Sequence, residues 1–143
     1  MSVAYIVDTS VAVKWVVPES GTGVEEGTER ALTLLDHDLS APDCMIAEFA
    51  NAMFKKVQAG EIGAGQARSA FAILPETMTF FPTADLVEAA LDLALEIVHP
   101  VHDCIFLVAA VQQGVPLVTA DRKFHAKCAA TGRPYPIVLL EDA

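Results

Sequence analysis

Four acidic residues stand at widely separated points of the sequence, and their positions indicate metal chemistry. Asp8 follows the apolar segment 3–7, and Asp121 follows a second apolar segment. Asp103 opens an apolar stretch, and Glu48 lies in a predicted helix that follows a proline. The carboxyl ends of parallel strands converge on one crevice of an open α/β sheet, where several carboxylates repel each other unless a cation lies between them. The sequence therefore predicts a divalent metal site built from these four side chains.

The length and composition of the chain indicate one domain. With 143 residues, 53% of them hydrophobic, and a mean hydropathy of +0.42, we expect a single domain over residues 1–143 with one substantial core. The longest charge-free stretch, 104–120, is interrupted by Gly114 and Pro116 and is not typical of a membrane span. The N-terminus reaches Asp8 without a basic segment, which argues against a secretory signal. We therefore expect a cytoplasmic protein whose apolar surplus covers a buried sheet and a subunit interface.

Cysteine spacing and net charge argue against several classes of function. Cys44, Cys104 and Cys128 share no CxxC spacing, so we expect reduced thiols rather than a disulfide framework or a thiolate zinc site. The net charge of −10 argues against general nucleic-acid affinity, which normally requires a basic surface. It is compatible with an enzyme that holds phosphates through bound cations, and with a basic protein partner.

Strand-like and helix-like segments alternate along the chain. The predicted strands are residues 3–7, 39–41, 78–81, 116–119 and 137–140. The predicted helices are residues 10–17, 29–37, 44–59, 65–74, 85–98 and 103–113, with a further helix after Asp121. Three glycines and three glutamates in residues 18–27 indicate a flexible acidic loop. The alternation predicts an α/β fold, a three-layer α/β/α sandwich around a parallel sheet of about five strands.

Each acidic residue also has a simpler interpretation. Asp8, Asp103 and Asp121 all precede or open predicted helices, where aspartate is a favoured N-cap or first-turn residue. Glu48 lies off the apolar stripe of its helix, as expected for a solvated face. Taken singly, capping and solvation therefore compete with a metal role for all four side chains.

The flanks of the four acids carry a shared pattern. In chain order the segments are Ile6-Val7-Asp8-Thr9-Ser10, Ala41-Pro42-Asp43 followed by Glu48 and Asn51, Asp103 at the head of an apolar helix, and residues 116–124, which read Pro-Leu-Val-Thr-Ala-Asp-Arg-Lys-Phe. This pattern resembles the PIN-domain family, and more narrowly the VapC-type toxins of toxin–antitoxin pairs, over nearly the whole chain. Cys104 and His102 depart from the residues usual in the family, but neither departure removes an acidic ligand.

The resemblance implies an endoribonuclease that depends on Mg²⁺ or Mn²⁺ and hydrolyses RNA phosphodiester bonds. In such an enzyme Asp8, Asp103 and Asp121 would hold one or two cations, and Glu48 would act directly or through water. The proton of the attacking water would pass to Glu48 or Asp121, and the sequence leaves both open. The resemblance further implies a homodimer and a small basic antitoxin that blocks the site.

Polar residues near the four acids are expected to support them. Hydroxyl and amide side chains would orient ligands or water, although hydroxyls at strand ends also cap helices: these are Thr9, Ser10, Asn51 and Thr119. Basic side chains would contact RNA phosphates, with a solvated face as the competing interpretation: these are Lys14, Arg122 and Lys123.

His99 and His102 together with Asp103 resemble a fragment of metal-ligand spacing. A phosphohydrolase of the HD type needs further histidines on an all-helical frame, and the predicted strands argue against that frame. We therefore interpret the two histidines as a loop pair without a role in the site.

Two alternatives to a toxin remain at this point. One is a PIN-domain nuclease with a housekeeping role in RNA processing and no antitoxin. The other is a non-enzymatic receiver-like regulatory module that binds Mg²⁺. A receiver-like module requires adjacent acidic residues after the first strand, and Asp8-Thr9-Ser10 lacks that pair.

Overall fold

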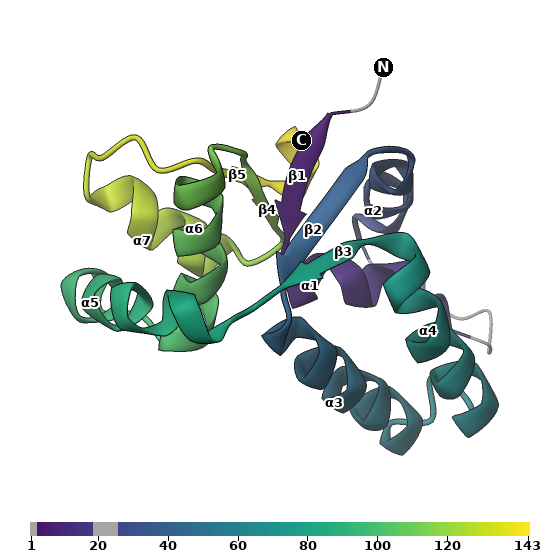
Figure 1. Ribbon diagram of the computed structural model, residues 1–143. Helices are drawn as coiled ribbons and strands as arrows, with labels where there is room; N and C mark the ends of the chain where they lie inside the picture. Colours follow the sequence, from purple (N-terminus) through teal and green to yellow (C-terminus); the bar gives the residue numbers. More distant parts are fainter. Residues whose placement is uncertain (1–2, 19–25) are drawn as a thin grey trace.

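The computed structural model describes residues 3–18 and 26–143, and a five-stranded parallel sheet forms its centre. The strands lie side by side in the order β3-β2-β1-β4-β5 (Figure 1). Their bounds are β1 (Ala4–Val7), β2 (Asp38–Pro42), β3 (Thr79–Phe81), β4 (Leu117–Thr119) and β5 (Ile137–Leu139). The predicted α/β fold with five parallel strands is confirmed.

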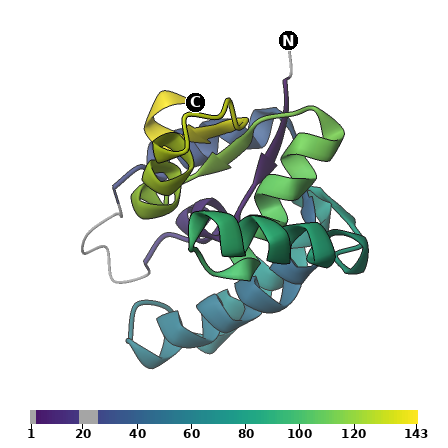
Figure 2. The same ribbon diagram turned by 90° about the vertical axis from the view of Figure 1, so that its left-hand side faces the viewer.

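Helices cover both faces of this sheet (Figures 1 and 2). They are α1 (Thr9–Ala12), α2 (Thr28–Thr33), α3 (Cys44–Gln58), α4 (Ala64–Thr77), α5 (Val87–Ile97), α6 (Val101–Gln113) and α7 (Arg122–Ala130). α6 and α7 lie on one face with α5 packed on α6, whereas α2, α3 and α4 lie on the other. Right-handed crossovers require this division, because the chain moves from β1 toward β3 in one direction and from β4 toward β5 in the other.

The helix at the centre of the fold is α6, and its sequence explains its position. Residues 104–110 are all buried, since this helix is apolar on nearly every side and packs between the sheet and α5. The sequence prediction of a buried helix here is therefore confirmed. The buried position gives Asp103, in the first turn of α6, a rigid support.

Two helices differ from their predicted bounds. The segment expected as one helix over 10–17 is the short α1 followed by a 3₁₀ turn, Val13–Trp15. The second is α4, which was predicted over residues 65–74. The residue before a proline is disfavoured in a helix, and Pro75 follows this range. The helix instead continues to Thr77, with Pro75 in its exposed last turn. Residues 19–25 of the predicted acidic loop lie outside the described residues.

Within residues 3–18 and 26–143, no single helix is long and apolar enough to cross a membrane. The segments Ala84–Ile97 and Val101–Gln113 reach that length and composition only together, and they are bent by 113° relative to each other.

The sheet has a topological switch point between β1 and β4, where the direction of strand addition reverses. The two strands pair in parallel register, with Val7 opposite Val118. Ligands of open α/β sheets bind outside the carboxyl ends of the strands at such a point. Asp8 directly follows β1, and Asp121 comes two residues after β4. The topology therefore brings these two acids to the same edge of the sheet.

Candidate metal centre

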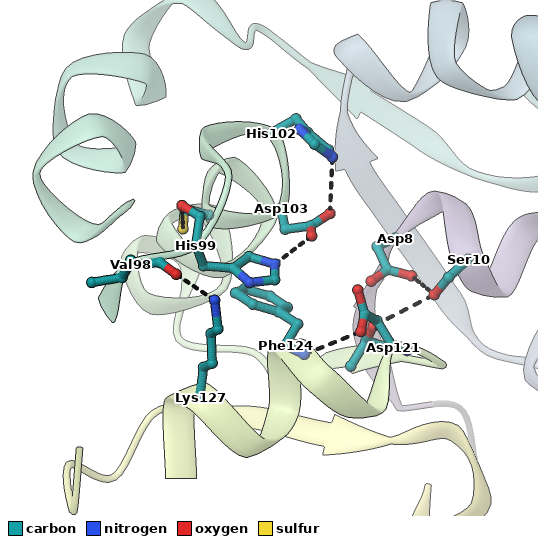
Figure 3. Close-up of polar contacts among 11 residues, drawn as sticks. Asp8, Ser10, Val98, His99, His102, Asp103, Asp121, Phe124 and Lys127 are labelled. Atoms are coloured by element: carbon teal, nitrogen blue, oxygen red, sulfur yellow. Dashed lines mark hydrogen bonds and ion pairs between the residues drawn. The ribbon is translucent and has the colours of Figure 1, made fainter. Parts of the chain in front are cut away.

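Asp8 and Asp121 each cap a helix, and their side chains lie beside each other at the carboxyl ends of β1 and β4 (Figure 3). Asp8 Oδ1 accepts the backbone N–H of Val11 at 3.3 Å, and Asp121 Oδ1 accepts that of Phe124 at 3.1 Å. The capping interpretation of both residues is correct. It does not compete with a metal role, because each cap is made by a single carboxylate oxygen, Oδ1.

Asp103 lies in the first turn of α6, and its side chain does not cap the helix. Its Oδ2 lies 2.6 Å from Nε2 of His99, and its Oδ1 lies 3.6 Å from Nε2 of His102 (Figure 3). A negative charge in the first turn is favoured by the helix dipole, which accounts for an aspartate at this position. The carboxylate projects from α6 toward Asp8 and Asp121 (Figure 3).

Three of these side chains offer ligand atoms for one cation. Atoms of His99, Asp103 and Asp121 lie within 4.8 Å of one another. All three residues are half-buried, and two of them contribute carboxylate oxygens, the donors that Mg²⁺ and Mn²⁺ prefer. The arrangement can therefore hold a divalent cation between α6 and α7.

Asp8 carries an unfavourable buried charge. Only 5% of the residue is exposed, and the pKa of its carboxyl is raised from 3.8 to about 6, mainly by burial. Hydrogen bonds from Ser10, Thr119 and Val11 oppose this rise in pKa, and the negative charge of Asp103 contributes to it. A cation beside these carboxylates would offset both the burial and the repulsion. The chemistry of the donor set thus fits a divalent metal.

Two hydroxyl groups join the loop after β1 to the loop after β4. Ser10 Oγ donates a hydrogen bond to Asp8 and accepts the backbone N–H of Ala120 at 2.9 Å. Thr119 Oγ1 accepts the backbone N–H of Asp121 at 3.0 Å and lies 3.5 Å from Ser10 Oγ. These bonds fix the two acid-bearing loops relative to each other.

Glu48 lies on α3 beside this cluster and outside the group of ligand atoms within 4.8 Å. Its Oε1 accepts a hydrogen bond of 2.9 Å from the hydroxyl of Thr9, the residue after Asp8. The half-buried position of Glu48 differs from a fully solvated face, which was its simpler interpretation. Asn51 is exposed one turn further along α3, and its supporting role stays a prediction.

The basic residues near the site contact acidic or carbonyl groups. Lys14 Nζ donates to the carbonyl of Glu26 at 2.7 Å. Arg122 lies 3.0 Å from a carboxylate oxygen of Glu141 and 3.8 Å from one of Glu26. Lys123 is exposed at the start of α7. Their contacts with RNA stay predictions.

The interpretation of His99 and His102 as a loop pair is correct for His99 and wrong for His102. His99 lies between α5 and α6, whereas His102 belongs to the first turn of α6. The His99 side chain is only 8% exposed and contacts Asp103, a contact that the loop interpretation did not include. The ring of His99 stacks on Phe124, which is 25 residues further along the chain (99 to 124), with centroids 4.6 Å apart. The spacing of four residues between His99 and Asp103 was the available signal, although it does not identify the stacking partner.

Asp43 occupies the N-cap position of α3, but its side chain makes no bond to that helix. Asp43 Oδ1 accepts the backbone N–H of Thr83 at 3.0 Å, while Thr83 Oγ1 accepts the N–H of Cys44 at 2.8 Å. The cap of α3 is thus supplied by a residue 39 positions away. Such a long-range exchange leaves no local sequence pattern.

The three cysteines behave as expected for free thiols. Burial raises the pKa of Cys104 to about 12 and those of Cys44 and Cys128 to about 11. A thiol with so high a pKa is a poor nucleophile and a poor metal ligand at neutral pH.

We expect metal-free Asp8→Asn to be more stable than the wild type at neutral pH. Between the unfolded pKa of 3.8 and the folded pKa of about 6, the folded wild type binds more protons than the unfolded chain. Its stability therefore falls as the pH rises through this window and stays lower above it, by about 2–3 kcal/mol. Asparagine keeps the cap and does not titrate. Urea unfolding in EDTA between about pH 4 and pH 8 measures the difference, which should vanish at the acidic end.

Asp92→Asn, an exposed change on α5, is the matched control and should shift the unfolding free energy by less than about 0.5 kcal/mol at every pH. A wild type that gains stability relative to Asp8→Asn as the pH rises would contradict the assignment.

The fold described above agrees with comparisons to known proteins. The sequence matches the PIN domain family over residues 5–130. A comparison with the sequences of curated proteins gave no match.

Several solved structures share the fold at low sequence identity. PAE2754 from Pyrobaculum aerophilum is 20% identical, with a TM-score of 0.70 over 99% of this chain and 93% of that one. VapC20 of Mycobacterium tuberculosis, described as a Sarcin-Ricin loop cleaving toxin, is 18% identical, with a TM-score of 0.61 over 85% of this chain and 93% of that one. A toxin–antitoxin complex from Klebsiella pneumoniae is 18% identical, with a TM-score of 0.60 over 97% and 99%.

The sheet order also separates the chain from a receiver-like module. Doubly wound receiver domains have the strand order 2-1-3-4-5, whereas this sheet has the order 3-2-1-4-5. The receiver-like alternative is therefore wrong. With a family match that spans most of its length, from residue 5 to residue 130, the chain belongs to the PIN domain family.

Proposed function

We propose that residues 1–143 form one nuclease domain, a metal-dependent endoribonuclease that is the toxin of a VapBC-type pair. The observation that carries the proposal is the convergence of Asp8, Asp103 and Asp121 on one crevice at the switch point of a PIN-type sheet. Hard oxygen donors favour Mg²⁺ or Mn²⁺, and a buried carboxylate with a raised pKa indicates negative charge that a cation would offset.

Each side chain of the site has its own role in the proposed hydrolysis of the phosphodiester bond. Asp103 and Asp121 would hold the cation, and Asp8, which lies outside the group of ligand atoms within 4.8 Å of one another, would add a carboxylate beside them. When bound, the cation lowers the pKa of a water molecule and stabilises charge on the phosphoryl oxygens. Glu48, oriented by Thr9 at the edge of the site, accepts a proton from the attacking water.

RNA could approach the acidic residues in spite of the acidic composition, because a bound cation would supply local positive charge. Three basic residues contact the phosphates that flank the scissile bond. Arg122 and Lys123 are the first residues of α7, and Lys14 lies against Glu26 in the loop before α2. To contact a phosphate, Arg122 gives up its ion pairs with Glu141 and Glu26. These ion pairs are exposed, so breaking them costs little free energy.

The partners we propose are a second copy of the chain and a small basic antitoxin, in the cytoplasm. The acidic net charge of −10 complements a basic partner. The structural neighbour from Klebsiella pneumoniae was solved as a toxin–antitoxin complex.

Purified protein should cleave structured RNA in Mg²⁺ or Mn²⁺ and stop when EDTA is added. Asp103→Asn should lower the rate by about 100-fold or more, since even groups around metal ligands cost up to that factor when lost. Glu88→Gln, an exposed change in the first turn of α5, should leave the rate unchanged. Gel analysis of end-labelled transcripts measures both. Cleavage that persists in EDTA would refute the metal mechanism.

Expression of the wild type without its antitoxin should arrest bacterial growth, and Asp103→Asn at equal abundance should not. The toxin reading requires this difference because cleavage of an essential RNA is the source of toxicity. Growth curves with matched immunoblots measure it. Normal growth with abundant wild-type protein that still cleaves RNA in vitro would favour the housekeeping nuclease instead.

The dimer surface we propose is the exposed apolar stripe of α5. Val87, Leu91, Leu95 and Val98 repeat at helical spacing and are 41%, 48%, 71% and 75% exposed. The stripe supports a contact surface here, because large contiguous apolar patches often mark sites of protein–protein interaction.

Leu95→Glu should therefore convert a dimer into a monomer, because it places a charge in the centre of this stripe. Sedimentation velocity at several concentrations measures the change. Ile73→Glu, at a 54% exposed position of α4 on the opposite face of the sheet, should leave the dimer intact. A monomeric wild type, or equal dissociation by both variants, would exclude the α5 surface.

A further inference from the structure

The turn between α5 and α6 has an unusual backbone. Val98 ends α5 in the left-handed region, with φ 57° and ψ 59°, and it is the one non-glycine residue with positive φ in the described part of the chain. A β-branched residue in this region is a genuine outlier. The Val98 side chain is 75% exposed, so its own packing does not account for the conformation. Strained conformations of this kind persist where the surrounding structure requires a particular geometry.

This turn directs the side chain of His99 into the protein. The His99 side chain is 8% exposed, and its ring lies on the ring of Phe124 at a centroid distance of 4.6 Å and an interplanar angle of 24° (Figure 3). Lys127, one turn further along α7, donates a hydrogen bond to the carbonyl of Val98. α7, which begins after Asp121, therefore holds the turn at two points.

The His99 ring in turn contacts Asp103. Its Nε2 lies 2.6 Å from Oδ2 of the carboxylate, and an ionised carboxylate can only accept, so Nε2 donates. A donor held by stacking and by the backbone fixes the rotamer of Asp103. The residue that binds the cation from α6 is thus oriented by a histidine clamped on α7.

We propose that His99 is a positioning residue, which orients Asp103 for the cation and is not itself a metal ligand. This inference rests on the proposed metal-dependent function and adds a residue to its site. It concerns the affinity of the centre for its cation, which is measurable without RNA.

The second ring nitrogen decides between positioning and ligation. A histidine that binds metal through one nitrogen almost always donates its other N–H to an acceptor. His99 Nδ1 is buried and has no hydrogen-bond partner among the described residues. The acceptor that fixes a metal-bound histidine is therefore missing at Nδ1, while Nε2 lies 2.6 Å from Oδ2 of Asp103. The ring is placed to support the Asp103 carboxylate rather than to bind the metal itself.

His102 provides a contrast on the same helix turn. Its side chain is 62% exposed, and its Nε2 lies 3.6 Å from Oδ1 of Asp103, too far for a hydrogen bond. His102 therefore does not orient the carboxylate, and it is the matched control.

The test compares Mn²⁺ binding to RNA-free protein by calorimetry for the wild type and four variants. His99→Gln carries an amide N–H near the position of Nε2 and should keep the affinity within a few-fold. His99→Asn has the same amide one methylene shorter, and His99→Leu has none; both should lose about 10–100-fold in affinity. His102→Gln should bind as the wild type does.

Several outcomes would overturn the inference. Equal losses in His99→Gln and His99→Asn would mean that the imidazole nitrogen binds the metal. Wild-type affinity in His99→Asn or His99→Leu would mean that Asp103 needs no orientation. Melting curves in EDTA verify folding, and if His99→Leu fails to fold, the two amide variants still decide. Mn²⁺ binding by a wild type that cleaves no RNA would refute the nuclease proposal alone.

Discussion

The burial of a carboxylate, Asp8, within a group of acids is the constraint on which the rest of this structure depends. Desolvation is the main cause that disfavours the ionised form of Asp8, and the charge of Asp103 adds to it. A chain without a fixed scaffold would avoid this cost by turning the side chain into solvent. Here the register of β1 and β4 and the buried helix α6 fix the backbones that carry the acids. The fold thus holds negative charge in place before any cation arrives, which is the preorganisation that an electrostatic catalyst requires.

The N-termini of helices offset part of the cost of this buried negative charge. Asp8 and Asp121 accept N–H groups at the beginnings of α1 and α7, and Asp103 lies in the first turn of α6. The positive ends of three helices therefore face the same crevice and stabilise negative charge there. Capping and metal binding appeared as competing interpretations of the sequence. In the structure the caps are part of what makes a crowded acidic site possible.

Local sequence patterns predicted the parts of the molecule that depend on local chemistry. Continuous apolar runs gave five strands in a parallel sheet, and the positions of Asp8 and Asp121 after two of them placed both acids at one edge. Contacts between distant segments escaped prediction, because a periodic pattern does not identify a partner. Thr9 bonds Glu48, 39 residues away, and the cap of α3 comes from Thr83.

The role of His99 escaped prediction for the same reason. Its four-residue spacing from Asp103 was visible in the sequence, yet the stacking on Phe124 and the left-handed backbone of Val98 depend on how α7 packs against the α5–α6 turn. A histidine beside an aspartate is ordinary, whereas a histidine whose ring is held from a third helix is constrained.

Val98 lies between the candidate metal centre and the exposed apolar stripe of α5. Its backbone sets the direction of His99, and its exposed side chain ends the apolar stripe of α5. Any protein surface that covers this stripe, a second copy of the chain included, buries the Val98 side chain and restricts the same residue that holds the strained turn. The stripe and the site are therefore linked through one backbone conformation, because a change in φ at Val98 moves His99 and, with it, the orientation of Asp103.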